Sequence, residues 1–273
     1  MPELPEVEVV RRDLDDALRG RRIVGVAVTG ARSVRRHPPE ELDRALQGAR
    51  IQRVGRHGKF LLVHLEGGDV LIVHLRMSGQ LRLAASPHDP SPRHCHVRLA
   101  FDDGRELRFV DPRTFGELFV TTPDVPELAA LGVDALDPAL TKARLGHLVS
   151  ARRGRLKALL LDQHVVAGLG NVYSDEIQHR AGLRGDRPGT SLTAADVARL
   201  HRALRSTLRE AITYRGSSLA DEQYVDLQGN LGAFQQRHRV YGREGQRCPR
   251  CRSLVVRERL AGRSHYSCPG CQA

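Results

Sequence analysis

Four of the five cysteines stand in two close pairs near the end of the chain. Cys248 and Cys251 form one Cys-x-x-Cys pair, and Cys268 and Cys271 form a second pair after an interval of 16 residues. Four thiolates with this spacing supply a closed tetrahedral site for a structural Zn²⁺. A redox pair or unpaired thiols would be the alternative interpretation. We therefore expect one structural zinc ion in a β-hairpin over Val240–Cys271.

The first residues of the chain could perform covalent chemistry. Removal of Met1 would expose the secondary amine of Pro2, and attack of this amine on a sugar C1′ would form an iminium ion that favours β-elimination. An α-amino group has a much lower reference pKa than a lysine, so a larger fraction is uncharged at neutral pH. Glu3 lies directly beside Pro2 as a candidate proton donor. A proline in the first turn of an ordinary helix is the alternative interpretation.

A glycine-containing turn precedes a predicted helix in the second half of the chain. Gly168-Leu-Gly170-Asn171 partly matches a dinucleotide-binding loop, but the third glycine is missing and no βαβ pattern surrounds it. We interpret the segment as a turn in which Asn171 caps the next helix, whose free N–H groups could receive a phosphate. We expect no nucleotide cofactor.

The positive charge of the chain is concentrated in its second half. The formal net charge is +11, and the sequence pI is near 10.2. Residues 1–140 hold 20 basic and 21 acidic side chains, whereas residues 141–273 hold 23 basic and 11 acidic ones. This excess favours a nucleic-acid partner, because phosphate contacts release condensed counterions. The arginine preference of a GC-rich genome, or charge needed for solubility, would produce the same excess.

The overall composition is that of a soluble globular protein. Hydrophobic residues make up 40% and charged residues 27% of the chain, and no apolar run is long enough to span a bilayer. Acidic residues dominate the first positions, where a signal peptide would carry basic and apolar residues. We expect a cytoplasmic protein with no membrane partner.

Apolar periodicity predicts the elements that position these groups. A helix is predicted from Pro2 to about Leu18, and a short helix over Pro39–Leu46. Between about Arg22 and Thr121 the pattern is that of strands joined by hairpin turns, which favours an antiparallel β-sandwich. The predicted strands are Ile23–Val28, Phe60–Leu65, Val70–Leu75, Val97–Phe101, Leu107–Val110 and Glu117–Val120, with Gly67-Gly68 and Asp103-Gly104 as turns.

The second half of the chain is predicted to be helical. The predicted helices are Leu140–Val149, Leu156–Gln163, Val172–Ala181 and Ala194–Tyr214. The fold class is therefore α+β. We expect four segments: a β-sandwich domain with an N-terminal helix over residues 1–121, a linker over 122–137, a helical domain over 138–236, and a zinc hairpin over 237–273.

Six motifs, in order and over nearly the whole chain, resemble those of the bacterial formamidopyrimidine-DNA glycosylases. They are Met1-Pro-Glu-Leu-Pro-Glu-Val-Glu8, His74-Leu-Arg-Met-Ser-Gly79, Asp111-Pro-Arg-Thr-Phe-Gly116, the stretch Asp162 to Glu176, Tyr241-Gly-Arg243 and the zinc hairpin. The resemblance implies a helix–two-turn–helix DNA-binding domain beside the sandwich. It also implies a monomeric, bifunctional enzyme that acts on double-stranded DNA containing oxidised bases or abasic sites. Such an enzyme removes oxidised purines, 8-oxoguanine and formamidopyrimidines, and then cleaves the strand by β,δ-elimination. It would be found with the bacterial nucleoid.

The resemblance also implies roles for catalytic residues. Pro2 would be the Schiff-base nucleophile, and Glu3 the acid that opens the sugar or protonates the leaving base. Glu6 would support this site. Lys59, in Gly58-Lys-Phe60, matches a lysine assigned to proton transfer and phosphate binding. Arg263 matches a finger arginine that binds phosphate and assists δ-elimination.

A second group of residues matches positions that contact DNA in the family. An enzyme that extrudes a base must fill the gap left in the stack, and Met77, Arg113 and Phe115 match the void-filling side chains. Phe115 would wedge between base pairs while Arg113 faces the orphaned cytosine. Further DNA contacts, mostly to phosphate, are implied for His74, His94, Arg152, Lys157 and Asn171.

The sequence departs from the family pattern at several positions. Arg76 stands where glycine is frequent, and Cys95 where aspartate is frequent. Within Ser217–Gln235, the segment expected to fold over the extruded base, the chain begins Gly216-Ser-Ser-Leu219 instead of Gly-Thr-Thr and carries the acidic pair Asp221-Glu222.

Two other functions compete with this interpretation. The endonuclease VIII branch, which prefers oxidised pyrimidines, usually begins Pro-Glu-Gly-Pro, so Leu4 favours the purine branch. A non-catalytic zinc-finger protein that recognises damaged DNA would not need Pro2, Glu3 and Lys59 together.

Overall fold

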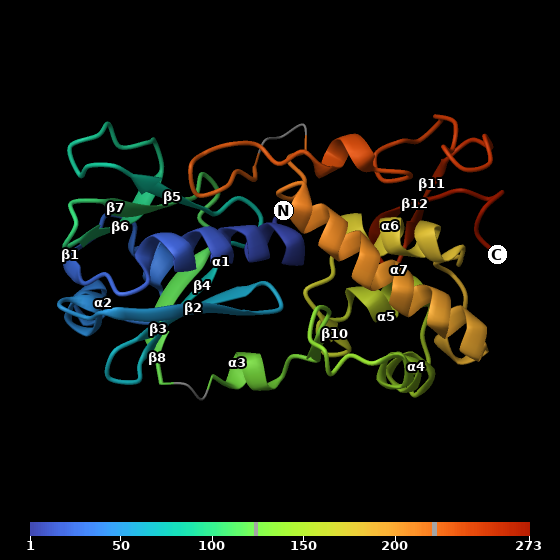
Figure 1. Cartoon of the computed structure of the whole chain (residues 1–273), viewed down its shortest axis with the longest axis horizontal. Coiled ribbons are helices and arrows are strands. Elements are labelled where there is room, and N and C mark those ends of the chain that lie inside the picture. Colours follow the sequence, from blue (N-terminus) through green and yellow to red (C-terminus); the bar gives the residue numbers. More distant parts are fainter. Residues whose placement is uncertain (123–124, 220–222) are drawn as a thin grey trace. The chain divides into compact units, whose positions relative to one another are not determined.

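The computed structural model describes residues 1–122, 125–219 and 223–273, so the acidic pair Asp221-Glu222 lies outside the described residues. The chain forms two compact units (Figure 1). The first unit consists of Met1–Ala129 together with Tyr214–Ala233, and the second of Ala130–Thr213 together with Phe234–Ala273. This grouping differs from the range 138–236 expected for the helical domain, because the described residues among 214–233 pack with the first unit.

Two four-stranded sheets form the β-sandwich of the first unit, as the sequence predicts. One sheet has the order β1-β6-β7-β5 and the other β2-β3-β4-β8, with every pairing antiparallel. The strands of the first sheet are β1 (Ile23–Val28), β5 (Gln80–Ala84), β6 (Cys95–Phe101) and β7 (Glu106–Val110). Those of the second are β2 (Ile51–His57), β3 (Phe60–Leu65), β4 (Val70–His74) and β8 (Glu117–Thr121). Strands β2 and β5 are absent from the sequence prediction.

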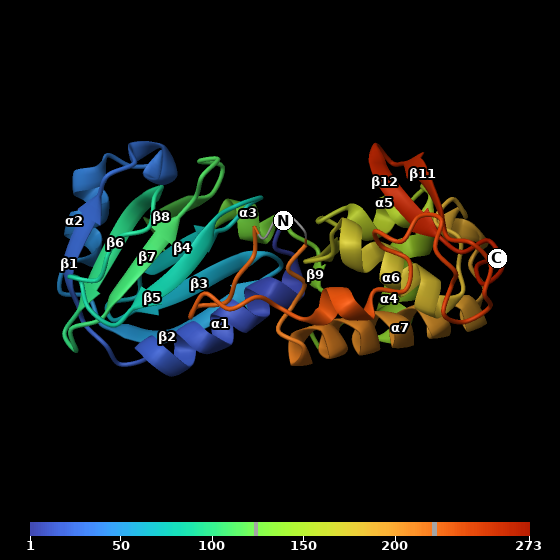
Figure 2. The same ribbon diagram turned by 90° about the horizontal axis from the view of Figure 1, so that it is seen from above.

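The N-terminal helix α1 (Leu4–Leu18) packs beside β2 (Figure 2). Its stripe Val7, Val10, Leu14 and Leu18 is buried in one core with side chains from both sheets. Asp15 on α1 also accepts the N–H of Val54 in β2 at 2.7 Å. The helix and the second sheet are therefore fixed to each other by apolar and polar contacts. Two shorter helical segments follow β1: η1 (Ala31–Val34) and α2 (Pro39–Leu46), the latter with its predicted bounds.

The segment that returns to the first unit completes its core. Tyr224 and Leu227 belong to the same hydrophobic cluster as the sandwich and α1. The N–H of Leu83 in β5 donates to the carbonyl of Leu227 at 2.9 Å. The segment therefore packs as part of the sandwich.

The second unit is mainly helical. Its helices are α4 (Lys142–Ser150), α5 (Leu156–Leu161), α6 (Asn171–Ala181) and α7 (Ala194–Thr213), with the 3₁₀ segments η2 (Gly189–Ser191) and η3 (Phe234–Arg237). The expected linker 122–137 contains α3 (Pro126–Ala129) and β9 (Val133–Asp134), and β9 pairs in parallel with β10 (Val166–Ala167). No helix in the described part of the chain has the length and apolar character needed to cross a membrane.

A β-hairpin ends the second unit. Strand β11 (Val256–Leu260) pairs antiparallel with β12 (Arg263–Ser267). The two residues between them, Ala261 and Gly262, have φ angles of 51° and 72°. Positive φ at both turn positions is the backbone of a tight hairpin turn, which the glycine adopts without strain. The hairpin predicted over Val240–Cys271 is present.

Candidate active site and nucleic-acid interface

Pro2 and Glu3 lie at the start of α1, where the chain enters the first unit. Glu3 is 2% exposed and Pro2 is buried, whereas Met1 is 43% exposed. The N–H of Glu3 donates to Glu6 Oε2 at 2.8 Å, in the reciprocal pattern of a capping box. The candidate nucleophile Pro2 therefore immediately precedes a capping box in which the helix fixes the carboxylates of Glu3 and Glu6.

Glu6 joins this helix start to the segment expected to cover an extruded base. While Oε2 accepts from Glu3, Oε1 accepts the N–H of Ser217 at 2.8 Å. Gly216 precedes this contact with a φ of +78°, and a Cβ there would lie 2.8 Å from Glu6 Oε1. A larger residue at position 216 would displace the carboxylate, so the glycine is needed for this approach.

Lys59 lies on the tight turn between β2 and β3. Gly58 has a φ of +56°, and Phe60, directly after Lys59, is paired in register with His74 on β4. The rings of Phe60 and His74 meet edge to face at 4.3 Å. The turn therefore holds Lys59 at the same end of the sheet as His74.

His74 is neutral at physiological pH. Burial, together with the positive charges of Arg76 and Lys59, lowers the pKa of His74 to about 3. The N–H of Arg76 donates to His74 Nδ1 at 3.0 Å, which leaves the ring proton on Nε2. Any phosphate contact made by His74 would be that of a neutral N–H donor.

Asp111 fixes both loops that carry the predicted void-filling residues. It is fully buried. Its Oδ1 accepts the hydroxyl of Ser78 at 2.5 Å and the N–H of Arg113 at 3.1 Å, and its Oδ2 accepts the N–H of Gly116 at 2.7 Å. Ser78 directly follows Met77, so a single carboxylate positions the loop of Met77 relative to the loop 113–116.

The predicted void-filling side chains are exposed on these loops. Met77 is 40% and Phe115 39% exposed, unusual values for large apolar residues. The guanidinium carbon of Arg113 lies 4.9 Å from the centre of the Phe115 ring. His94 is exposed nearby, and its carbonyl accepts the N–H of Asp111 at 3.0 Å.

Arg76 adopts a backbone conformation that explains why glycine is frequent there. Its φ is 54°, in the left-handed region. Its guanidinium contacts Glu117 Oε1 at 2.8 Å, and Arg36 contacts the other oxygen at 3.2 Å. Burial opposes ionisation of Glu117, but the two guanidinium groups outweigh it and lower the pKa of this carboxyl to about 2. The contact with Glu117 thus fixes the side chain of Arg76, whose backbone lies in the left-handed region.

The candidate DNA contacts of the second unit differ in accessibility. Arg152 is exposed and lies 3.4 Å from Asp162. Lys157 is fully buried, with its ammonium group 2.6 Å from Asp175, so it presents no atom to a phosphate in this structure. The prediction that Lys157 contacts DNA directly does not fit this burial.

The structure corrects the predicted capping role of Asn171. Gly170 occupies the N-cap position of α6, and its carbonyl accepts the N–H of Ser174 at 3.0 Å. Asn171 is the first helical residue, half-buried, and its Oδ1 has no hydrogen-bond partner among the described residues. Helix formation extends one residue further than expected, because glycine at the N-cap costs little.

The four paired cysteines form a site that fits one zinc ion. Their Sγ atoms all lie within 4.8 Å of one another, with 3.7 Å between Cys248 and Cys271 and 3.4 Å between Cys251 and Cys268. A tetrahedral ion with Zn–S bonds of about 2.3 Å requires separations of ~3.8 Å. His179 Nε2 lies 3.3 Å from Cys248 Sγ, an outer contact of the kind that orients a ligand.

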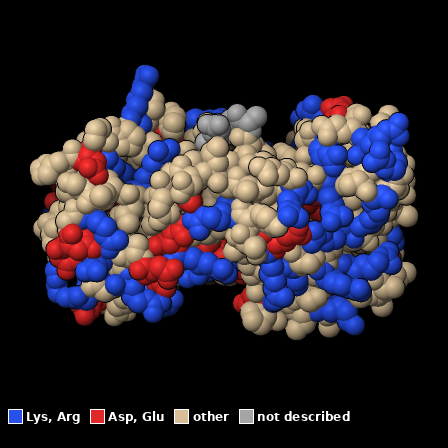
Figure 3. Space-filling view, turned by 45° about the horizontal axis from the view of Figure 1, so that its top comes forward, with Lys and Arg blue, Asp and Glu red and all other residues tan. Residues whose placement is uncertain are grey.

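Arg263 begins β12 on the same hairpin and is exposed. Basic side chains also gather over the second unit on the face seen in Figure 3. This distribution agrees with the excess of positive charge in residues 141–273.

Comparison with known proteins identifies the family. Residues 1–118 match the formamidopyrimidine-DNA glycosylase N-terminal domain, residues 131–223 the corresponding H2TH domain, and residues 245–273 a zinc finger found in FPG and IleRS. The formamidopyrimidine-DNA glycosylase of Pelotomaculum thermopropionicum is 42% identical, over 100% of this chain and 99% of its own. That of Salinispora arenicola is 45% identical, over 100% and 96%.

Solved structures agree with this result. The MutM (Fpg) protein from Thermus thermophilus has a TM-score of 0.88 and 42% identity, over 99% of this chain and 98% of its own. Lactococcus lactis Fpg, solved in complex with DNA containing an abasic site, has a TM-score of 0.90 and 32% identity, over 99% of both chains. These matches place the chain among the DNA glycosylases. It belongs to the formamidopyrimidine-DNA glycosylase family, which confirms the resemblance found in its motifs.

The sequence did not indicate the residues that fix the candidate site. Ser217 lies 211 positions from Glu6, its hydrogen-bond partner. Asp111 was part of a recognised motif, but its three acceptor contacts were not predicted. The membership of Asp111 in that motif was the one local signal that could have singled it out.

We expect Asp111→Asn to lower the free energy of unfolding by about 1–3 kcal/mol, because its amide group would meet the N–H of Gly116 and leave a buried donor unpaired. Urea denaturation measures the change. Asp69→Asn, on an exposed turn, is the control and should stay within about 0.5 kcal/mol of the wild type. Equal losses in both variants would contradict the role assigned to Asp111.

Removal of zinc should unfold the terminal hairpin and leave the sandwich intact. Without the ion, the four thiolates no longer tie the two Cys-x-x-Cys loops together, and the hairpin keeps a small apolar cluster and the contacts of His265 and Tyr266 with Asp175. Hydrogen exchange after treatment with a chelator should show lost protection in β11 and β12 but not in β3. Unchanged protection in the hairpin would refute the structural role of the metal.

Proposed function

We propose that the protein excises oxidised purines, 8-oxoguanine and formamidopyrimidines, from duplex DNA and then cleaves the strand by β,δ-elimination. The observation that carries this proposal is the placement of Pro2 at a buried helix start, directly before Glu3, whose N–H donates to the carboxylate of Glu6 that also binds Ser217. The Lactococcus lactis relatives, solved with DNA containing an abasic site or Fapy-dG, support this substrate class.

The proposed reaction begins once Met1 has been removed. The free nitrogen of Pro2 attacks C1′ of the damaged nucleotide and gives up its proton, while the C1′–base bond breaks and the base leaves protonated. The C1′–O4′ bond also breaks and O4′ takes up a proton, so that C1′ is left doubly bonded to the nitrogen. Glu3 supplies a proton to the leaving base or to O4′. Because the nitrogen is secondary, the resulting iminium ion stays cationic. It withdraws electrons from C2′, so that loss of a C2′ proton expels the 3′ phosphate. Lys59 serves the proton transfers, and Arg263 assists the second elimination, which expels the 5′ phosphate.

DNA recognition is proposed to involve exposed loops of both units. Met77, Arg113 and Phe115 would fill the gap left by the extruded base, since their loops share the anchor Asp111. His74, His94, Arg152 and Asn171 would contact the backbone. All these groups come from one chain, and we propose that it acts as a monomer on the nucleoid of a bacterial cytoplasm.

Borohydride trapping tests the nucleophile. On a duplex with 8-oxoguanine opposite cytosine, the wild type should give a reduced covalent adduct that maps to residue 2, and Pro2→Gly should lose base excision. A duplex with an oxidised pyrimidine distinguishes the endonuclease VIII-like activity. Tight binding without any adduct or nicking would replace the proposal with damage recognition alone.

Glu3→Gln should separate the two reaction steps. Loss of the general acid should slow excision of 8-oxoguanine by about 10²-fold or more, because positioned proton transfer contributes on this order. Cleavage of a preformed abasic site needs no protonation of a leaving base and should persist. Glu40→Gln, in the exposed first turn of α2, is the matched control for loss of one negative charge. Equal slowing of base excision and of abasic-site cleavage would exclude protonation of the leaving base as the role of Glu3.

A further inference from the structure

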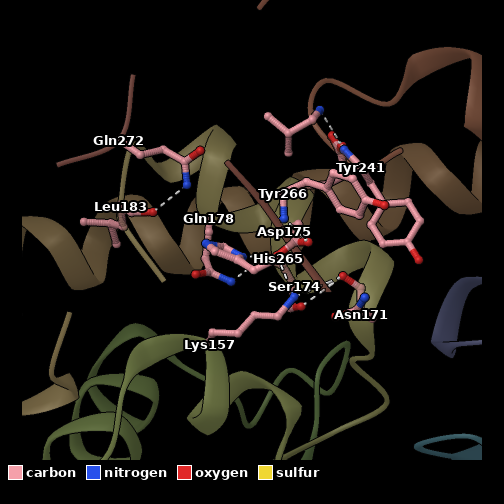
Figure 4. A network of polar contacts seen from close by, with 12 residues as sticks. Lys157, Asn171, Ser174, Asp175, Gln178, Leu183, Tyr241, His265, Tyr266 and Gln272 are labelled. Carbon is pink, nitrogen blue, oxygen red and sulfur yellow. Dashed lines mark hydrogen bonds and ion pairs between the residues drawn. The ribbon is translucent and has the colours of Figure 1, made fainter. Parts of the chain in front are cut away.

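A buried polar network joins three segments of the second unit. The carboxylate of Asp175 on α6 lies at its centre (Figure 4). Its Oδ1 is 2.6 Å from Lys157 Nζ on α5 and 2.6 Å from His265 Nδ1 on β12. Its Oδ2 accepts the N–H of Tyr266 at 3.0 Å. Lys157, Asp175 and His265 have side-chain exposures of 0–1%, so all of their interactions are internal.

The network contacts the two functional elements of this unit. Asp175 lies one helical turn after Asn171, the first residue of α6, and Lys157 Nζ is 3.5 Å from the carbonyl of Asn171. His265 stands two positions after Arg263 on β12. Side chains two positions apart project from the same face of a strand. The contact between Asp175 and His265 therefore fixes the orientation of the strand face that carries Arg263.

Apolar packing alone would not define the orientation of the hairpin relative to α6. The cluster that holds it contains Val240 and Val255 with two of the zinc-binding cysteines, and most of β11 is exposed. A buried carboxylate, by contrast, is stable only when donors occupy defined directions around it. Asp175 receives such donors from both the side chain of His265 and the main chain of Tyr266. It therefore sets both the position and the rotation of β12.

We propose that Asp175, acting through His265, is a positioning residue that orients Arg263 for δ-elimination, with Lys157 as its internal counter-ion. This inference rests on the proposed function, since it takes from it the role of Arg263. The role of internal counter-ion is also compatible with the complete burial of Lys157, whereas a direct contact with a DNA phosphate is not.

Two substitutions of His265 test the orientation of Arg263. His265→Leu removes the donor to Asp175, whereas His265→Asn keeps an N–H donor near the position of Nδ1, and both leave the pair of Lys157 and Asp175 intact. On a duplex with a preformed abasic site, the measured quantity is the ratio of δ- to β-elimination product in a single turnover. Zinc content and borohydride adduct are measured in parallel, with Arg263→Ala as the reference.

We expect His265→Leu to lower the ratio about tenfold or more, as Arg263→Ala does, because a displacement of about 1 Å is costly in catalysis. His265→Asn should keep most of the wild-type ratio. In both variants the amount of borohydride adduct and the zinc content should equal those of the wild type. An unchanged ratio in His265→Leu overturns the inference, as does a proportional fall in adduct and both products. If Arg263→Ala itself leaves the ratio unchanged, the proposed role of Arg263 fails first.

The salt dependence of DNA binding tests the role of Lys157. The association constant K for DNA falls with salt, and loss of one phosphate contact reduces the magnitude of the slope of log K against log salt concentration by about 0.9. In an Arg263→Ala background, the double substitution Lys157→Met, Asp175→Asn removes the buried pair without leaving one charge alone. Because Arg263 no longer contributes there, the slope on duplex DNA with an abasic-site analogue should equal that of Arg263→Ala alone. Arg152→Ala should reduce the magnitude of the slope. A slope smaller in magnitude in the triple variant than in Arg263→Ala alone would mean that Lys157 binds phosphate and would overturn its internal role.

Discussion

A carboxylate removed from water must accept hydrogen bonds from the groups that enclose it, and this constraint organises both units. Glu6 and Asp111 each bind main-chain N–H groups of the loops around the candidate active site. Asp175 does the same for the hairpin. Glu176 accepts the N–H groups of residues 239–241, although burial still raises its pKa. The loops that carry the proposed functional side chains are thus fixed by acids to which no reaction step is assigned.

This arrangement separates the functional groups from the groups that determine stability. The side chains of Met77, Phe115 and Arg263 are exposed and contribute little to the stability of the fold. The carboxylates of Asp111 and Asp175, which fix their loops and strand, are buried. A side chain that must meet DNA cannot also be held by packing. The required precision comes instead from the main chain, which the buried acids fix. Substituting such an acid therefore changes the geometry of several exposed residues at once.

Much of the fold follows from local patterns in the sequence, because apolar periodicity and turn residues act over short distances. Helix α2 has its predicted bounds, and the cysteine spacing predicted the metal site. Strand β2 was not predicted because much of its side-chain surface is polar or exposed, so the period of two is weak. The contact of Glu6 with Ser217 could not be predicted, since no local pattern relates residues so far apart. The cap of α6 was misplaced by one residue because glycine competes well with asparagine there.

The first unit is discontinuous in sequence, and this has a consequence for synthesis of the protein. A nascent chain that ends at Thr213 already contains all eight strands of the sandwich. It lacks Tyr224 and Leu227 from the core, and it lacks the N–H of Ser217 that Glu6 requires. The four helices α4 to α7 of the second unit are made before these residues leave the ribosome, and its terminal hairpin is made after them. The proposed nucleophile Pro2 thus acquires its complete surroundings only late in translation, after the helices of the second unit but before the terminal hairpin.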